Sequence, residues 1–512
     1  MVRLGILVAL AAATAACFER GGAREAPAPA AAALPSTATG WRTADPPGVP
    51  DPTATVRLAL EAEPATLDPF ATLDAASGRV LAGVVEGLWC PTGDGGVEPC
   101  VAASYQRLGQ RYIFHLDPAR RFSDGAAVTA ADVVASLDAS RGVGHAPGPL
   151  AGVLDDAVAI TAVDPATVAL EVRGDRATRL RDLALVPIVP ARQLASPSLA
   201  SAPIGTGPLA IASWTRGEAI RLRRVDGAAR RAGAAAVAWV VVADRADAIR
   251  RLAAGQLDVV TQVPIAEAVA ATAAHPRLAR FRYAQPAMLV AVYNCRRPAL
   301  ADPAVRRDLT ATLDRAGIAR TILGGAATVT GPWLPDDPRA DPTVAPIPFA
   351  RARAAHPPAL AVLVPAGSTT TARIADIWAQ DARGRFALTV ETAPFADVLA
   401  RLAAGDFDVA ITSISAGPEV DPGARLTSAA PPDQAWPGLR DAALDRALAA
   451  LAAAPDAGAQ IAAGREVHRL VAALAPMAFI AVDTRAGLAA ATVGGLGAAP
   501  GAPEAWRLWQ AR

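Results

Sequence analysis

Short stretches of the chain alternate between hydrophobic and polar residues, a period of two that is typical of half-buried β-strands. Residues 113–117 have this pattern, and residues 157–172 have it on both sides of a turn at Asp164-Pro165. Runs rich in Val, Leu, Ile and Ala predict further strands at 56–60, 289–294, 360–364, 386–390 and 477–482. Strands are therefore expected along the whole chain.

Helices are predicted between these strands by the signals at their ends. Thr129, with Asp132 three residues later, predicts an N-terminal capping box in its acidic form. Asp302 can cap another helix, Pro303 suits its first turn, and the glycines at 324–325 end it. The apolar face of this single helix is formed by Val305, Leu309, Leu313 and Ile318.

One unit of sequence occurs twice: a helix that ends near a glycine, followed by an aspartate that opens a strand. The first copy lies at 247–260, with Gly255 before Asp258, and the second lies at 398–411. Residues 440–474 form a last, Ala-rich helical stretch. Two copies of one unit suggest two related α/β lobes, and 512 residues are too many for one ordinary core.

Composition and motifs argue against two classes of protein. The formal net charge is +1, so no nucleic-acid partner is predicted. There is no G-x-S-x-G, no H-E-x-x-H and no phosphate-binding Gly loop, so no enzyme is predicted. The five His have no metal-ligand spacing and are expected to be structural or solvated. No cofactor and no metal are predicted.

The first 17 residues have the features of an export signal. Arg3 precedes an apolar run, 4–13, that is too short to span a bilayer, and Thr14-Ala15-Ala16-Cys17 follows. Small residues before a Cys resemble the bacterial lipobox, which implies cleavage before Cys17 and a lipid on its sulfur. An ordinary secretory signal that is cleaved nearby is the alternative. Residues 18–55, rich in Ala and Pro, predict a flexible tether.

Export permits disulfides. Cys90 and Cys100 flank the Gly-rich turn at 93–96, so we predict a disulfide between them, with two free thiols as the alternative. Cys295 then has no partner and is expected to be a small buried hydrophobic residue.

The stretch 86–140 resembles the extracytoplasmic solute-binding proteins of ABC importers, in the peptide, dipeptide and nickel branch called family 5. Members carry E-G-L, then D-x-x-G-x-x-x-P-x-x-A-x-S-W, Y-x-F-x-L-R and F-x-D-G-x-P-x-T-A-x-D-V. The Ile204–Leu209 stretch resembles the G-T-G-P segment of the family. The residues that carry the resemblance are Glu86-Gly87-Leu88, Asp94, Pro99, Ala102, Ser104-Tyr105, Tyr112, Phe114, Leu116, Phe122, Asp124-Gly125, Thr129-Ala130 and Asp132-Val133.

The resemblance implies an α/β fold: a bilobed, periplasmic-binding-protein-like fold of type II, cluster C, with an extra inserted α/β domain. The division that it implies is a signal peptide at 1–17, a tether at 18–55, lobe I at 56–95 with 200–270 and 485–512, inserted domain II at 96–199, and lobe III at 271–484.

The function that the resemblance implies is that of a substrate-binding lipoprotein. It would capture a peptide or similar small solute, an oligopeptide or an amine-bearing molecule, between two lobes by hinge closure and deliver it to ABC permease and ATPase subunits. The protein would be a monomer, exported and held at the membrane by its lipid. A sensory or cell-surface receptor without transport is the alternative, and an exported hydrolase is a third class.

Ligand-contacting residues are also implied. Glu63, in the loop after the first strand, stands where peptide-binding members have an acidic pocket residue. The loop after strand 408–412 departs from the family, because Pro418 and Ser415 replace an Asp and a Trp, which argues against ordinary peptide binding. Glu419 could substitute for that Asp or could be an exposed loop acid. The contacts implied here are Ser413, Ser415, Gly417, Glu419 and Asp421.

The last implied contact is Asp483. Residues 477–487 resemble a strand whose final Tyr borders the family's pocket, and Ala481 stands at that Tyr. Asp483 lies two residues further along the strand and therefore on the same face. Its carboxylate could point at the cleft and favour a cationic or amine-bearing ligand, or it could pair with Arg485. The pocket is expected to be less aromatic and more polar than usual.

Overall fold

The computed structural model describes most of the chain after its first 39 residues. The predicted signal peptide, Cys17 and most of the predicted tether lie outside the described residues. The described residues are 40–42, 44–71, 74–92, 97–146, 148, 150, 152–174, 179–351, 357–366, 368–415, 423–431, 434–454, 456–496 and 504–511.

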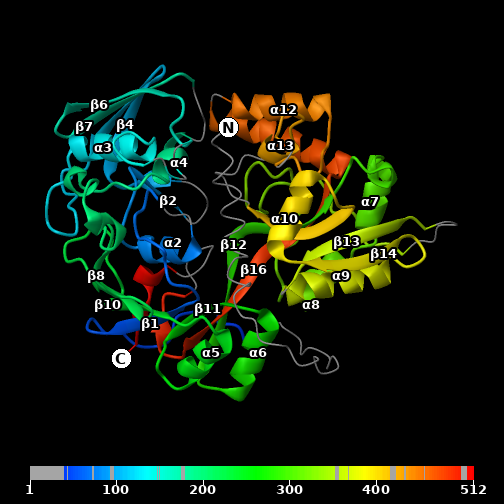
Figure 1. Cartoon of the computed structure of the whole chain (residues 1–512), viewed down its shortest axis with the longest axis horizontal. Helices are drawn as coiled ribbons and strands as arrows, with labels where there is room; N and C mark the ends of the chain where they lie inside the picture. Colours follow the sequence, from blue (N-terminus) through cyan, green and yellow to red (C-terminus); the bar gives the residue numbers. More distant parts are fainter. Residues whose placement is uncertain are drawn as a thin grey trace.

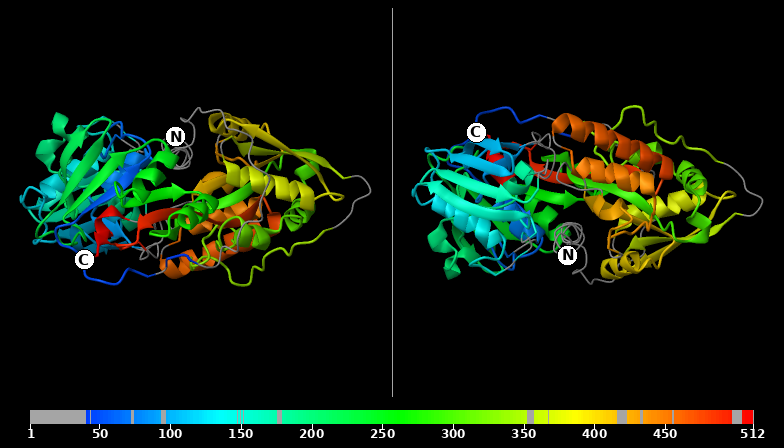
Figure 2. Two further views of the ribbon diagram at one scale, coloured as in Figure 1. Left: turned by 90° about the horizontal axis from the view of Figure 1, so that it is seen from below. Right: turned by 90° about the horizontal axis from the view of Figure 1, so that it is seen from above.

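One mixed sheet of ten strands runs through the centre of the molecule (Figure 1). Its two longest strands, β12 and β16, pair antiparallel and pass from one half of the molecule to the other (Figures 1 and 2). The strand order is β14 (Ala387–Ala393), β13 (Ala359–Pro365), β15 (Val409–Ser415), β12 (Leu278–Tyr293), β16 (Met477–Ala490), β11 (Val259–Val263), β1 (Thr55–Leu60), β10 (Ala236–Val241), β9 (Ala219–Arg224) and β8 (Leu209–Thr215).

The half of the sheet around β1 has its own core on each face, and we call this half lobe I. On one face β1 packs with α2 (Ala75–Leu81), and on the other the strands pack with α5 (Arg245–Ala253) and α6 (Ile265–Ala274). Phe281 and Tyr283, in the first half of β12, belong to the α2 core, although the sequence places 271–484 in lobe III. Strand β12 therefore begins inside lobe I and ends outside it.

The other half, lobe III, is built in the same way. One face packs with α7 (Pro303–Ala311), α8 (Arg315–Thr321) and α9 (Thr369–Asp381). The opposite face packs with α10 (Phe395–Ala404), α11 (Gly423–Leu426), α12 (Ala442–Ala452) and α13 (Ala457–Leu474). Each lobe therefore buries both faces of its part of the sheet, which explains why most of these strands read as continuous apolar runs.

The prediction of a single helix over 302–324 is wrong, because the structure has two helices there. Asp302 does cap α7, accepting a hydrogen bond from the Ala304 N–H at 2.8 Å, but α7 ends at Ala311. Asp314 accepts a hydrogen bond from the Gly317 N–H at 2.8 Å and starts α8 as a new N-cap residue. Residues 440–474 are likewise divided into α12 and α13, because Asp456 caps the second helix.

The inserted part, which we call domain II, has a separate sheet and core. The strand order is β4 (Ala102–Leu108), β5 (Arg111–Leu116), β7 (Thr167–Val172), β6 (Ala157–Asp164), so the predicted strand pair at 157–172 is confirmed. The hairpin of β2 (Trp89–Pro91) and β3 (Val97–Pro99) lies at its base, and its helices are α3 (Ala130–Ser140) and α4 (Arg179–Ala184). The capping box of Thr129 and Asp132 is present at the start of α3.

The described end of the predicted tether is held against lobe I. Trp41 pairs with Arg280 at the start of β12, and its ring lies 5.2 Å from the guanidinium groups of both Arg280 and Arg282. Further along, the Asp51 N–H donates to the Gln510 carbonyl at 2.8 Å. These contacts correct the expectation of a free tether up to residue 55, because one aromatic residue in a Pro-rich segment is enough to dock it.

Short elements complete the chain. A small antiparallel pair, β17 (Val493–Gly494) and β18 (Trp509–Gln510), brings the C-terminus back beside β1 (Figure 1). In the described part of the chain, 3₁₀ turns lie at Ala191–Gln193, Pro197–Ala200, Pro298–Leu300 and Ala505–Arg507. Within the described residues, no helix combines the length and the hydropathy needed to cross a bilayer.

Candidate ligand-binding site

The face of β16 that links the two lobes becomes polar in its middle. Side chains alternate along a strand, so 481, 483, 485, 487 and 489 share one face. Ala481 packs in the lobe III core and Ala489 packs in the lobe I core. Asp483 and Arg485 therefore occupy the position between the two cores, where the β12–β16 register also shifts, between Ala284 and Met288.

Asp483 connects the two sides of this position. The Ser413 hydroxyl donates to its Oδ2 at 3.0 Å, and Arg485 Nη2 donates to the same oxygen at 2.8 Å. The sequence left open whether Asp483 faces the cleft or pairs with Arg485, and in the structure the pair is made. Burial lowers the Arg485 pKa, but the charge and hydrogen bond of Asp483 outweigh it, so the pKa is raised. Arg485 is therefore a fixed cation beside a fixed carboxylate.

Tyr283 lies directly opposite Arg485 in the β12–β16 register. Its hydroxyl accepts a hydrogen bond from the Gln262 N–H at 2.8 Å, and burial raises its pKa. Gln262 has φ of +58°, a conformation that costs a non-glycine residue free energy and that persists mainly where surrounding contacts or function hold it. Tyr283 is thus a neutral phenol whose proton remains available to a partner.

Polar atoms without partners lie around Tyr283. Glu61, just after β1, is ion-paired with Arg79 of α2, and both charges act on the Tyr283 hydroxyl. Within the part of the chain that the structure describes, three buried polar atoms make no hydrogen bond here: Glu61 Oε1, Thr261 Oγ1 and Arg485 Nε. An unsatisfied buried polar atom costs about 1–3 kcal/mol. This is a pattern that a polar ligand or ordered water would relieve.

Glu63 is engaged within lobe I instead. Its Oε1 accepts from Trp214 Nε1 and from the Gly217 N–H, both at 3.0 Å. The Arg216 guanidinium stacks on the Trp214 ring at 3.5 Å and lies 4.0 Å from the same carboxylate. The recorded partners of Glu63 all belong to the β8–β9 hairpin region, so its carboxylate holds that hairpin and does not contact Ser413 or Asp483.

The other predicted contacts are placed only in part. Ser415 ends β15 and pairs with Ala287 of β12, two residues from Ser413 and on the same face of the strand. Gly417, Glu419 and Asp421 lie outside the described residues. The structure therefore brings Ser413, Ser415 and Asp483 to one place, beside the crossing of β12 and β16.

A cavity among the described residues lies elsewhere. It has a volume of about 410 Å³, open space at its mouth included, and it is enclosed between α13 and the segment 345–347 of lobe III. Arg315 lines it, but its guanidinium donates to the Phe479 and Ile347 carbonyls at 3.2 and 2.7 Å. Because these donors are satisfied and neither Ser413 nor Asp483 lines the cavity, we do not take it as the ligand site.

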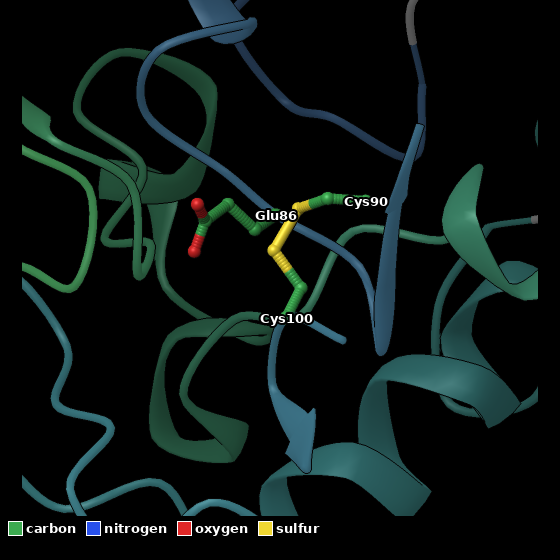
Figure 3. A group of neighbouring side chains, drawn as sticks. All are labelled: Glu86, Cys90 and Cys100. Carbon is green, nitrogen blue, oxygen red and sulfur yellow. A yellow bond between two sulfur atoms is a disulfide. The ribbon is translucent and has the colours of Figure 1, made fainter. Parts of the chain in front are cut away.

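The predicted Cys90–Cys100 disulfide is present, with the two Cα atoms 5.5 Å apart (Figure 3). Glu86 lies beside it, and its Oε2 accepts from Arg120 at 3.0 Å and from the Thr206 hydroxyl at 2.9 Å. The three residues are close enough to resemble a metal site. Cysteines in a disulfide offer no thiolate, and the carboxylate is already bonded, so the group joins domain II to lobe I. Cys295 is mostly buried, and burial raises its pKa.

Sequence reasoning missed Glu61, Arg79 and Tyr283. Glu61 had a signal, because it stands two residues before Glu63 in the same acidic loop. Tyr283 had none, since its position opposite Arg485 follows from the register of two strands about 200 residues apart, which no local pattern reveals.

Comparison with known proteins agrees with this architecture. A relative is the probable deoxycholate-binding periplasmic protein YgiS of Escherichia coli (strain K12), 28% identical over 315 residues, which are 55% of this chain and 58% of the relative. The match thus spans less than two thirds of that relative.

Two solved structures share the fold. One is NikA from Brucella suis in complex with Fe(III)-EDTA, with a TM-score of 0.77 and 19% identity, covering 89% of this chain and 100% of the other. The second is DppA from Helicobacter pylori in complex with the peptide STSA, with a TM-score of 0.70 and 16% identity, covering 90% and 98%. At these identities the likeness shows the fold alone, an α/β bilobed binding-protein fold with an inserted domain.

The profile of the bacterial extracellular solute-binding proteins, family 5 (middle region), matches residues 96–435. This is most of the described chain and spans domain II, the crossing strand β12 and much of lobe III. Proteins of this family bind solutes outside the cytoplasm and are not enzymes. The chain belongs to the bacterial extracellular solute-binding proteins, family 5.

Proposed function

We propose that this protein is the substrate-binding component of an ABC importer, which captures a peptide or similar small solute between lobes I and III and delivers it to permease and ATPase subunits. The observation that carries the proposal is the polar group formed by Ser413, Asp483, Arg485 and Tyr283, at the point where β12 and β16 pass between two separate cores. A solute held there would touch both lobes.

Hinge closure follows from the same geometry. Lobes I and III have separate hydrophobic cores, so each can move as a rigid body, and the irregular pairing between Ala284 and Met288 is the place to bend. A solute favours the closed form because only that form makes the contacts of both lobes. Binding in the micromolar range supplies about 8 kcal/mol, part of which would hold the lobes together.

The hydrogen bonding of Asp483 supports the proposal that the solute bears an amine. Both of its recorded hydrogen bonds end on Oδ2, so within the described residues its Oδ1 is left as an acceptor. A ligand ammonium there would make a charge-assisted hydrogen bond. Ser413 and Ser415 would add hydroxyl contacts from β15, and Gly417, Glu419 and Asp421 remain proposed contacts. Glu63, held by Trp214, would shape the lobe I side without touching the ligand.

The lipid anchor is part of the proposal. The Thr14-Ala15-Ala16-Cys17 sequence supports export with lipid attached to Cys17, and the following Pro-rich segment would hold a monomeric receptor near the membrane. Labelling with a radioactive fatty acid tests this: the wild type should take up label, and Cys17→Ser should not.

A second candidate is a sensory or cell-surface receptor that does not transport. Ser415 and Ala481 stand where related pockets have aromatic residues, and this altered pocket favours the alternative. Deletion of the gene distinguishes the two functions. Loss of solute uptake supports the importer, whereas intact uptake with a lost transcriptional response supports the sensor.

The test of binding is native mass spectrometry of the protein purified from its host. We expect a co-purified solute of defined mass that is lost on mild denaturation. Ser413→Ala should lower its occupancy, while the exposed Ser201→Ala should not. A protein that carries no solute and takes up none from a host metabolite extract would contradict the receptor function.

A further inference from the structure

The contact of Trp41 with β12 gathers several arginines at one place on lobe I. Arg280 and Arg282 are two residues apart and therefore lie on one face of the strand. The Trp41 ring is 5.2 Å from the guanidinium groups of both. The Arg42 N–H donates to the Arg280 carbonyl at 2.8 Å, which fixes a third arginine beside the same strand.

The two arginines of β12 differ in what else they contact. Arg280 Nη1 donates to the Thr272 hydroxyl of α6 at 2.6 Å, so this side chain joins the strand to the helix. Arg282 is exposed, and its guanidinium makes no hydrogen bond and no ion pair to the residues that the structure describes. It lies against Gly325, where an added Cβ would be 3.1 Å from Arg282 Nη1. The N–H donors of Arg282 therefore remain available to a partner from outside.

The positive charge at this place is not balanced by nearby acids. Burial lowers the Arg282 pKa, and no described carboxylate raises it again. Arg42 has Asp45 as an opposing charge, yet burial still lowers its pKa, and its Nη1 is buried without a hydrogen bond. Arg277 is exposed just before β12, and the sequence has no Asp or Glu from 268 to 301. Because the whole chain has a formal net charge of only +1, this excess is local.

The position of these arginines in the chain indicates a membrane as their partner. The segment that follows Cys17 meets lobe I at Trp41, so a lipid on Cys17 would bring this part of lobe I near the bilayer. Anionic lipids attract basic side chains that lie close to their surface. A guanidinium can bind a phosphate through two parallel N–H donors, and lipid headgroups supply phosphates.

We propose that Arg42, Arg277 and Arg282, gathered around Trp41, bind the phosphate groups of anionic membrane lipids, so that lobe I lies against the bilayer. The proposal goes beyond the receptor function and does not depend on the capture of a solute. The lipid on Cys17 would supply the apolar anchor, and the arginines would add an electrostatic contact that orients the folded protein.

The test measures the partition of the full-length protein onto vesicles by sedimentation. Every protein carries Cys17→Ser, which removes the attached lipid. The vesicles contain either phosphatidylglycerol with phosphatidylcholine or phosphatidylcholine alone. The readout is the ratio of the two partition coefficients, because the N-terminal segment is the same in all the proteins compared.

The variants change the charge at one position at a time. Arg282→Gln removes a charge, Arg282→Lys keeps it, and Arg277→Gln is added to Arg282→Gln to remove a second one. Arg446→Gln, an exposed arginine on α12 of lobe III, is the matched control.

We expect the parent protein to prefer the anionic vesicles. Arg282→Gln should lower the ratio about fivefold, which corresponds to about 1 kcal/mol for one basic residue at an anionic surface. The double variant should lower it about 25-fold if the two charges act independently. Arg282→Lys and Arg446→Gln should stay within twofold of the parent. Added salt should lower the ratio of the parent, because it screens the attraction.

Equal partition of the parent onto both kinds of vesicle overturns the proposal, and so does a ratio that the double variant leaves unchanged. Inorganic phosphate at millimolar concentration separates a membrane from a soluble anion. If phosphate raises the melting temperature of the parent but not of Arg282→Gln, while the vesicles are not distinguished, the arginines bind a free anion and the membrane proposal is wrong.

Two further measurements separate the remaining explanations. Equal melting temperatures of Arg282→Gln and Arg446→Gln would show that a lower ratio does not come from unfolding, and Arg277→Gln alone replaces Arg282→Gln if they differ. A fall in solute uptake by cells with Arg282→Gln and an unchanged ratio would assign the arginines to a protein partner and overturn the proposal.

Discussion

Only one of the two carboxylate oxygens of Asp483, Oδ2, accepts hydrogen bonds from the described residues. Ser413 and Arg485 both donate to Oδ2, and this fixes the rotamer and leaves Oδ1 as an acceptor in the described part of the chain. A preorganised acceptor gives up little conformational entropy when a ligand arrives. The position therefore combines a structural ion pair with a free hydrogen-bonding edge.

Asp483→Asn should weaken the binding of an amine-bearing solute about tenfold, or about 1.4 kcal/mol, because the amide keeps the shape but lacks the charge. Calorimetry with the co-purified solute measures this. Asp337→Asn, which breaks the Arg339 pair in the same lobe, is the control for a loss of stability without a loss of affinity. Equal affinities for Asp483→Asn and the wild type would remove Asp483 from the site.

His468 should make the stability of the folded protein depend on pH, whether or not a ligand is bound. It is 1% exposed, the Asp341 N–H donates to its Nδ1 at 2.8 Å, and its Nε2 hydrogen-bonds to the Thr330 hydroxyl at 3.1 Å. Burial lowers its pKa, while nearby Asp341 raises it and Arg469 lowers it, and the net shift is downward. The neutral ring is thus the form that fits the fold.

Because the unfolded chain binds a proton at His468 more readily, stability present above about pH 6.5 is lost as the pH falls toward the lowered folded pKa. The loss is at most about 1.4 kcal/mol per pH unit. Urea unfolding at several pH values between neutral and mildly acidic should show a smaller slope for His468→Gln than for the wild type. Identical slopes would mean that the pKa of His468 is the same in the folded and the unfolded protein.

For individual residues, the sequence predicted that Ser413, Ser415 and Asp483 belong to one site, because the matching strands in the family border its pocket. It did not predict Tyr283. The role of Tyr283 depends on the register of β12 against β16, which becomes visible only in the folded structure.

Strand β16 shows how one element serves two cores. Its apolar ends pack in lobes III and I, and its polar middle lies at the crossing. Gly487 lies opposite Phe281, and a Cβ there would be 2.2 Å from the Phe281 ring. The glycine is required by packing, because the aromatic ring fills the place of its side chain.

Gly487→Ala should therefore destabilise the protein by about 1–3 kcal/mol, the usual cost of overpacking a core. Gly78→Ala, within α2 and with no atom within 4 Å of the new methyl group, is the control and should be neutral or slightly stabilising. Urea denaturation of the two variants measures the difference. Similar midpoints for both would show that the Phe281 ring moves aside without cost.

The sequence predicted the elements well where their ends carry caps, as at Thr129 with Asp132 and at Asp302. It failed where one apolar face continued across two helices. The residues Val305, Leu309, Leu313 and Ile318 kept a helical spacing although Asp314 begins a new helix. Periodicity reports which side is buried, and it does not report a local break that a capping residue introduces.

At the scale of the whole molecule, domain II and the lobes that would bind the solute have separate cores. Domain II has its own sheet, core and disulfide, and it meets lobe I through Glu86, Arg120 and Thr206. None of the ligand residues proposed here belongs to it. Its stability and the affinity of the receptor should therefore vary independently.

Cys90→Ser with Cys100→Ser should lower the stability of domain II by about 2–4 kcal/mol, since the disulfide closes a loop of 10 residues. The affinity for the solute should remain within twofold, as measured by calorimetry below the first unfolding transition. Hydrogen exchange should locate the lost protection in β4–β7. A large fall in affinity would instead place domain II in contact with the ligand.

Trp41 packs on the first residues of β12, so the lipid that we propose on Cys17 would be connected to the folded protein at lobe I. The 23 residues from 18 to 40 would then allow a reach of at most about 80 Å between that lipid and lobe I. Because the connection ends at lobe I, we expect hinge closure to move lobe III relative to the point of attachment, while lobe I keeps its place beside that point. When solute binds, the distance between a fluorophore on α12 and a label at residue 42 should change, while the distance between a fluorophore on β9 and the same label should stay constant.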